Sequence, residues 1–227
     1  MIKNIFFDYN GTIINFKACE TEAIKLAGHD YGRIIKYDEI VRYQEINSAL
    51  WEKYNAGEIS RDTVLIERFE TFLREINLKI LAEDFNETYL SKLNNLFILE
   101  PHVTETLELL SEKYNLYVIT NGVQQLVMNK LYNAKLAFFI KDVFTSERSG
   151  YHKPSCEFFL YCLNTIDAKP EECLIVGDSL TSDIIGGVNS GIFTCWYNPQ
   201  NEPNTMNVTP NIEISDFADL DYSIYNL

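Results

Sequence analysis

FFDYNGT, residues 6–12, joins a run of apolar side chains directly to turn-forming residues. The apolar residues 5–7 predict a buried β-strand, and Asn10 and Gly11 predict that this strand ends abruptly in a turn. Asp8 then lies at the carboxyl end of the strand. In an open parallel sheet, ligands bind and chemistry takes place at that edge. The stretch therefore predicts an α/β fold with a functional carboxylate at the end of its first strand.

From residue 16 to residue 96 the sequence pattern changes from strand to helix. Ser60 is suited to cap the N-terminus of the third helix, and Gly57 to end the helix before it. Because strand-like alternation is almost absent here, we interpret residues 16–96 as a helical domain inserted after the first strand. The predicted helices span residues 18–27, 37–54, 60–76 and about 82–96.

After Pro101 the predicted elements alternate between helix and strand. Such alternation specifies a parallel sheet that is covered by helices on both faces. Together with the first strand, this part of the chain predicts a doubly wound α/β domain, and residues 212–214 predict a strand at its edge. The predicted helices span residues 103–114, 123–132, about 155–165 and 181–189, and the predicted strands span residues 116–120, the surroundings of Val143, 174–177 and 192–197.

The 227 residues carry a formal net charge of −14 and are 46% apolar. An apolar share of this size provides a proper core. The negative charge would repel a nucleic-acid polymer, whose phosphates bind basic surfaces. A small phosphorylated ligand is different, because one lysine, one metal ion and a few backbone N–H groups can hold it locally. We therefore expect a small-molecule ligand, no nucleic-acid partner, and a monomer or small homo-oligomer.

The longer apolar stretches have the length of strands, so we expect no membrane span and no secretion signal. The five cysteines include no C-x-x-C pair, which argues against a zinc site and against a disulfide framework. Reduced thiols in a cytoplasmic protein are the simplest interpretation.

Four short segments fall at the carboxyl ends of predicted strands, where one parallel sheet would gather them. They are FFDYNGT (6–12), VITNG (118–122), HKP (152–154) and VGDSLTSD (176–183). Their order and spacing together resemble the four sequence motifs of the haloacid dehalogenase-like (HAD) superfamily, over the whole chain. The resemblance implies a Rossmann-like core domain of residues 1–15 and 97–227 and a helical cap domain of residues 16–96.

The resemblance assigns roles to the acids of the first and fourth segments. Asp8 would attack phosphorus and form an aspartyl-phosphate, although taken singly it could equally be a carboxylate that caps a turn. Asp178 and Asp8 would hold Mg²⁺, with the backbone carbonyl of Asn10 as a third ligand, since magnesium prefers hard oxygen ligands. Asp183 would steady the water shell of the metal, although an acid early in a helix is also favoured by the helix dipole.

The second and third segments would bind the phosphoryl group. Thr120 would offer its hydroxyl and Asn121 an N–H donor, while Gly122 lets the backbone approach closely. Lys153 would supply the positive charge that lets Asp8 meet an anion. Taken singly, Thr120 is an ordinary strand residue and Lys153 a solvated lysine. The position of HKP directly before a helix favours the functional role.

Three further segments resemble the pyrimidine 5'-nucleotidase branch of the superfamily. They are ALWEKYNAGEIS (49–60), RFETF (68–72) and SGIFTCWYN (190–198). Most aromatic residues of the helical domain are explained as helix-packing core, yet cap residues set substrate choice in this fold. The resemblance thus implies a nucleoside 5'-monophosphate as the substrate.

The first motif departs from the family pattern D-x-D-x-T, because Asn10 stands where the second aspartate belongs. An amide cannot protonate a leaving oxygen or take a proton from water, and loss of such a group typically costs about 10²–10⁴ in rate. Three explanations account for Asn10: an engineered replacement of aspartate, a natural protein with slow or absent turnover, or a chemistry that needs no proton at this position.

Two alternative functions follow from Asn10. The 2-haloacid dehalogenases of this fold displace halide, which needs no protonation, but they usually carry tyrosine at this position and lack a metal-binding acid in the fourth motif. Since Asp178 and Asp183 are present, the sequence favours a magnesium-dependent phosphatase. A catalytically silent protein that binds a phosphometabolite is the other alternative.

Overall fold

The computed structural model describes residues 1–227, apart from the side chain of Asn55. The chain folds as two compact units: an α/β unit of Met1–Phe16 with Phe97–Leu227, and a helical unit of Lys17–Leu96. Among the described residues, no helix combines the length and the apolar character needed to cross a membrane. Each unit has its own buried apolar side chains, as an independent folding unit requires.

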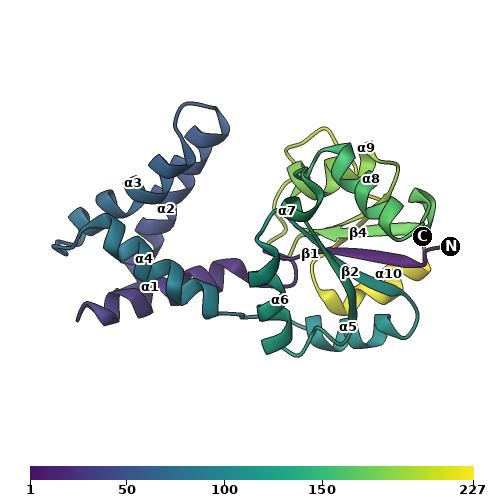
Figure 1. Ribbon diagram of the computed structural model, residues 1–227, viewed down its shortest axis with the longest axis horizontal. Helices are drawn as coiled ribbons and strands as arrows, with labels where there is room; N and C mark the ends of the chain where they lie inside the picture. Colours follow the sequence, from purple (N-terminus) through teal and green to yellow (C-terminus); the bar gives the residue numbers. More distant parts are fainter. The chain divides into compact units, whose positions relative to one another are not determined.

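A parallel sheet forms the centre of the α/β unit (Figure 1). Its described strands lie in the order β3-β2-β1-β4-β5-β6, so the order reverses beside the first strand. All neighbours pair in parallel. The predicted doubly wound sheet is confirmed, and β6 lies at its edge as predicted. The strands are β1 (Asn4–Asp8), β2 (Asn115–Thr120), β3 (Ile140–Thr145), β4 (Cys173–Gly177), β5 (Phe193–Tyr197) and β6 (Ile212–Ile214).

The side chains of β1 are buried on both faces of the sheet, because successive residues of a strand point to opposite sides. Phe6 contacts the rings of Tyr117 and Phe144 on one face. Phe7 stacks on Phe217 on the other. The Phe6 face is covered by α8 (Cys156–Thr165) and α9 (Ile185–Asn189), and the Phe7 face by α5 (Val103–Ser111) and α10 (Leu220–Tyr225) (Figure 1).

Three helices differ most from the prediction, and one of them lies in the helical unit, where the predicted helix 18–27 spans Phe16–Asp30. The predicted helix 103–114 ends at Ser111 in α5, because the chain then turns into β2. The predicted helix 181–189 begins with a π-helical turn, in which the carbonyl of Ser179 accepts hydrogen bonds from the N–H groups of both Asp183 (3.0 Å) and Ile184 (3.2 Å). Such turns are frequent at functional sites. The other helical elements are α6 (Gln124–Asn133), α7 (Ser146–Ser149), η1 (Pro170–Glu172), η2 (Leu180–Ile184) and η3 (Phe217–Asp219).

The helical unit follows β1 directly, and the predicted boundary residues act as expected. Ser60 caps its helix by accepting a hydrogen bond from the N–H of Thr63 at 3.1 Å. Gly57 has a φ of 75° just after the preceding helix ends, which is the left-handed conformation that favours glycine there. The helices are α1 (Phe16–Asp30), α2 (Tyr37–Asn55), α3 (Arg61–Glu75) and α4 (Ala82–Asn95).

Aromatic side chains form much of the interior of the helical unit. The ring of Tyr43 stacks on Phe69 with centroids 5.4 Å apart, and Phe69 meets Tyr89 at 5.1 Å. The Arg68 guanidinium lies 4.7 Å from the centroid of Phe69. Charged groups of this kind are rarely buried without partners, and the contacts of Arg68 and of the buried Glu20 account for their position.

Glu20 is a buried carboxylate held by hydrogen bonds within the helical unit. Its Oε1 accepts from the hydroxyls of Tyr43 (3.4 Å) and Tyr89 (3.1 Å) and from the amide of Asn47 (3.3 Å). Arg68 donates to the amide oxygen of Asn47 at 3.4 Å, which joins the two charges in one network. Burial raises the pKa of Glu20, while Tyr89 and Arg68 counteract the shift.

Glu20→Ala should destabilise the protein by about 2–4 kcal/mol, because it leaves two buried tyrosine hydroxyls and the Asn47 amide without their acceptor and removes the negative charge near Arg68. Glu20→Gln keeps an oxygen acceptor and should lose less than half as much. Urea unfolding followed by circular dichroism measures both. Equal stability of the alanine variant and the parent would show that the network does not stabilise the helical unit.

Candidate active site

One pocket of about 320 Å³ in the α/β unit opens at the carboxyl ends of β1, β2 and β4. It lies where the strand order reverses, which is the usual place for a ligand in an open α/β sheet. All eight residues predicted for the site line this pocket, together with two serines that the sequence analysis did not single out. The lining residues are Asp8, Asn10, Thr120, Asn121, Gly122, Lys153, Asp178, Ser179, Ser182 and Asp183.

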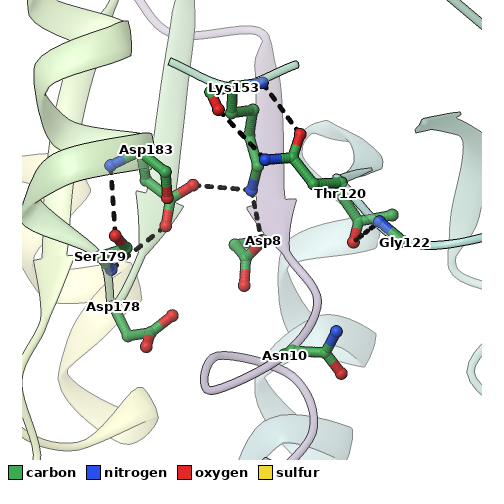
Figure 2. Close-up of a pocket in the computed structure, with 10 residues that line it drawn as sticks. Asp8, Asn10, Thr120, Gly122, Lys153, Asp178, Ser179 and Asp183 are labelled. Carbon is green, nitrogen blue, oxygen red and sulfur yellow. Dashed lines mark hydrogen bonds and ion pairs between the residues drawn. The ribbon is translucent and has the colours of Figure 1, made fainter. Parts of the chain in front are cut away.

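Lys153 joins two of the acids (Figure 2). Its buried ammonium group donates hydrogen bonds to Asp8 and, at 2.7 Å, to Asp183. The carbonyl oxygen of Ile119 in β2 lies 3.5 Å from the same nitrogen. The lysine is therefore not a solvated surface residue, because its charge is paired inside the pocket.

Asn121 positions the backbone of Lys153. Its side-chain oxygen accepts the Lys153 N–H at 2.9 Å, and its amide nitrogen donates to the Lys153 carbonyl at 3.1 Å. The Asn121 side chain thus connects the end of β2 to the segment before α8. At the same strand end, Thr120 Oγ1 accepts the Gly122 N–H at 3.0 Å, which leaves the hydroxyl proton of Thr120 for another acceptor.

Three carboxylates in the pocket form a group that fits a metal ion. Asp8, Asp178 and Asp183 each have an oxygen within 4.8 Å of the others. Hard carboxylate oxygens in an incomplete shell suit Mg²⁺, which retains several waters. The donor set contains neither sulfur nor imidazole, so it suits Mg²⁺ better than Zn²⁺.

Asp178 is held by contacts that the sequence analysis missed. The Thr12 hydroxyl donates to Asp178 Oδ1 at 3.1 Å, and the same oxygen of Thr12 accepts the Asp178 N–H at 3.0 Å. The buried Trp196 indole donates to the Asp178 carbonyl at 2.9 Å. Gly11 has a φ of 91°, and a Cβ there would overlap the Asp178 carboxylate. The first motif therefore shapes the position of Asp178 as well as that of Asp8.

Asp183 reaches the site because β4 ends in a glycine. A Cβ on Gly177 would overlap the Asp183 side chain. Asp183 Oδ2 accepts the Ser179 N–H at 3.2 Å, and its other oxygen accepts from Lys153 (Figure 2). Asp183 thus lies beside the lysine from within the π-helical turn of Leu180–Ile184.

The electrostatics of the pocket follow from three acids around one lysine. Burial raises the pKa of Asp8 to about 8, with Asp183 and Asp178 adding to the shift and Lys153 opposing it. Burial and the neighbouring Asp183 raise the pKa of Asp178 to about 6. Burial alone would lower the pKa of Lys153, but the two carboxylates raise it. The pocket therefore carries excess negative potential, which a divalent cation would relieve.

Comparison with known proteins places the chain in a family. Residues 2–191 match the haloacid dehalogenase-like hydrolases. A HAD hydrolase of Bacillus subtilis, YfnB, is 34% identical over 99% of this chain and 96% of its own. The pyrimidine 5'-nucleotidase PynA of Streptococcus pneumoniae is 30% identical over 96% of this chain and 93% of its own. The chain therefore belongs to the haloacid dehalogenase-like hydrolase family, as the four motifs predicted.

The fold agrees with that of solved relatives. The crystal structure of YfnB from Bacillus subtilis bound to magnesium superposes with a TM-score of 0.90, at 33% identity, over 100% of this chain and 99% of the other.

A second pyrimidine 5'-nucleotidase, YjjG of Escherichia coli, is 26% identical in sequence over 96% of this chain and 95% of its own. Phosphatases are thus among the relatives that match nearly the whole chain.

Asp178→Asn should stabilise the metal-free protein in a pH-dependent way. The pKa of this carboxyl rises from 3.8 to about 6 on folding, so its ionisation favours the unfolded chain. The variant's gain in free energy of unfolding over the parent should be small near pH ~4, grow up to pH ~6 and stay constant above, at about 1–3 kcal/mol. Each kcal/mol should raise the Tm by about 2–4 °C. Calorimetric scans with a chelator present measure it.

The exposed Asp167 supplies the control, since Asp167→Asn removes one carboxylate in a turn that does not line the pocket. Added Mg²⁺ should raise the Tm of the parent and not that of Asp178→Asn. A Tm difference independent of pH would contradict the inferred burial of charge at Asp178.

Proposed function

We propose that this chain is a magnesium-dependent phosphomonoester hydrolase that forms an aspartyl-phosphate on Asp8 and whose substrate is a nucleoside 5'-monophosphate. The observation that supports it best is the ion cluster in which the buried Lys153 ammonium pairs with Asp8 and Asp183, beside Asp178. A carboxylate nucleophile needs such a cation before it can approach a phosphate dianion.

In the proposed reaction Asp8 supplies the oxygen that attacks phosphorus. Lys153 neutralises charge on Asp8 and on the incoming phosphoryl group, and the Thr120 hydroxyl donates to a phosphoryl oxygen. Asp8, Asp178 and the backbone carbonyl of Asn10 would hold Mg²⁺, with Asp183 acting on its water shell. When bound, this ion would neutralise further charge on the phosphoryl oxygens.

The choice of a nucleotide rests on the relatives and on the helical unit. Two relatives that align over 96% of this chain are pyrimidine 5'-nucleotidases. We assign residues 17–96 the role of a cap that selects the substrate. The ligand is then a small phosphorylated metabolite of the cytoplasm rather than a nucleic-acid polymer or a membrane surface, in keeping with a net charge of −14.

Asn10 limits the proposed activity without removing the binding site. The charged groups that would hold phosphate and metal line the pocket together, but the amide supplies no proton to the leaving oxygen. The group of three acids argues against a dehalogenase, for which no metal is needed. A silent phosphometabolite-binding protein is the second candidate, and Asn10 is the observation that favours it.

Asp8→Ala should abolish phosphate release from nucleoside monophosphates, by at least roughly 10³-fold, because the nucleophile is gone. The measurement is best made in a background carrying Asn10→Asp, where turnover is expected to be higher. Glu112→Ala, at an exposed acid that ends α5 in the α/β unit, is the matched control and should keep full activity. Activity within tenfold of the parent would exclude Asp8 as the nucleophile.

Asn10→Asp should raise turnover of nucleoside monophosphates by about 10² or more, because it introduces a near-isosteric acid at the edge of an otherwise complete site. The parent should bind the same nucleotides with comparable affinity, measured by titration calorimetry with Mg²⁺. Asn10→Ala changes the same side chain without adding an acid and should show no gain. If the folded Asn10→Asp protein stays inert on a panel of nucleoside and sugar phosphates, the binding-protein function is favoured.

A further inference from the structure

We propose that the site, with Asn10 in place, transfers a phosphoryl group to Asp8 from acyl phosphates, whose leaving group needs no proton, and that the phosphorylated protein then persists. This inference rests on the proposed role of Asp8 as nucleophile. It goes further because it names the class of phosphoryl donor that this sequence can use and the species that should accumulate.

The described residues that line the pocket include no acid that is available to protonate a leaving group. Only four of them titrate, and each is committed elsewhere: Asp8 is the nucleophile, Lys153 pairs with two carboxylates, and Asp178 and Asp183 are the remaining acids of the metal-binding group. The other lining residues offer amides, hydroxyls or backbone only. An amide is too weak an acid to protonate the leaving oxygen. A hydroxyl of serine or threonine is no stronger an acid than the alcohol that would leave.

The missing proton would be needed at the leaving group. The leaving group of an in-line displacement departs on the side opposite the attacking oxygen. In Figure 2 Lys153 and Asn10 lie on different sides of Asp8, and the Lys153 ammonium points to Asp8 and Asp183. The lysine therefore serves the nucleophile. On the Asn10 side of Asp8 the pocket presents an amide, which cannot protonate a leaving group.

In the first half-reaction, the leaving group decides whether a proton is needed. An Asp8 oxygen forms a bond to phosphorus, the bond from phosphorus to the leaving oxygen breaks, and its electron pair leaves with that oxygen. A carboxylate, with a pKa near ~4, departs as a stable anion. An alcohol, whose pKa is close to that of water at about 16, must gain a proton as it departs. The penalty of about 10²–10⁴ for a missing acid therefore applies to alkyl esters and vanishes for acyl phosphates.

The second half-reaction explains why the phosphorylated protein should persist. Water adds its oxygen to phosphorus, the Asp8 carboxylate is released, and one proton passes from the water to the phosphate product or the solvent. A carboxylate at position 10 would take up that proton as the water attacks, but an amide cannot. Formation from an acyl phosphate is then fast and hydrolysis is slow, which gives a burst of one leaving group per site followed by slow turnover.

The experiment compares the parent with Asn10→Asp across a series of phosphoryl donors in Mg²⁺: acetyl phosphate, p-nitrophenyl phosphate, phenyl phosphate and uridine 5'-monophosphate. Acid-quenched samples are analysed by intact-mass spectrometry for a covalent phosphoryl group, which peptide mapping then locates. The ratio of the Asn10→Asp rate to the parent rate of phosphorylation should be about 10²–10⁴ for the nucleotide and fall towards one for acetyl phosphate. The parent, and not the variant, should accumulate phosphoryl-Asp8.

The outcomes separate this inference from the proposed function. A rate ratio that is the same for every donor would show that the residue at position 10 does not act by protonating the leaving group. That result would overturn the inference, while phosphatase activity of Asn10→Asp would leave the proposed function standing. Modification of Asp8→Ala to the same extent as the parent would overturn both, because Asp8 would then not be the acceptor. Absence of any covalent phosphoryl group with acetyl phosphate would also overturn the inference, whatever the activity of Asn10→Asp.

Discussion

A single buried ammonium group, that of Lys153, lies between the carboxylates of Asp8 and Asp183, with Asp178 beside them. Burying any one of these charges alone would cost several kcal/mol, so each depends on its partners. Three acids around one lysine still leave an excess of negative charge. The group of acids therefore fits a divalent cation, and we propose that such an ion and a phosphate group bind here, at the expense of stability in the metal-free fold.

The sheet makes this cluster possible because parallel strands end at one edge. Asp8 and Thr120 are the last residues of β1 and β2, Asp178 directly follows β4, and the strand order reverses between β1 and β4. Helices on both faces bury the sheet, so the strands are rigid supports for side chains at their ends. Two glycines, Gly11 and Gly177, let the Asp178 and Asp183 carboxylates lie against the backbone of neighbouring turns.

Asn10 separates two properties that usually occur together in such a site. In the proposed site, electrostatic stabilisation of phosphate would depend on Lys153, the acids and the metal that they would hold, and none of these is altered by an amide at position 10. Proton transfer depends on one ionisable group, and there the amide fails. The nature of the leaving group then decides whether phosphoryl transfer proceeds, which connects the proposed phosphatase ancestry with the acyl phosphate chemistry inferred for this sequence.

Much of the fold was determined by the sequence itself, because strands buried on both faces and amphipathic helices have local apolar patterns. The alternation after Pro101 and the caps at Ser60 and Gly57 depend on near neighbours and were predicted correctly. The resemblance implied that Lys153 acts beside Asp8, 145 residues away, but only the tertiary structure decided that the same ammonium group also pairs with Asp183. It also decided that the Trp196 indole holds the Asp178 carbonyl and that a π-helical turn carries Asp183. Such contacts depend on distances and angles between distant segments, which local patterns do not encode.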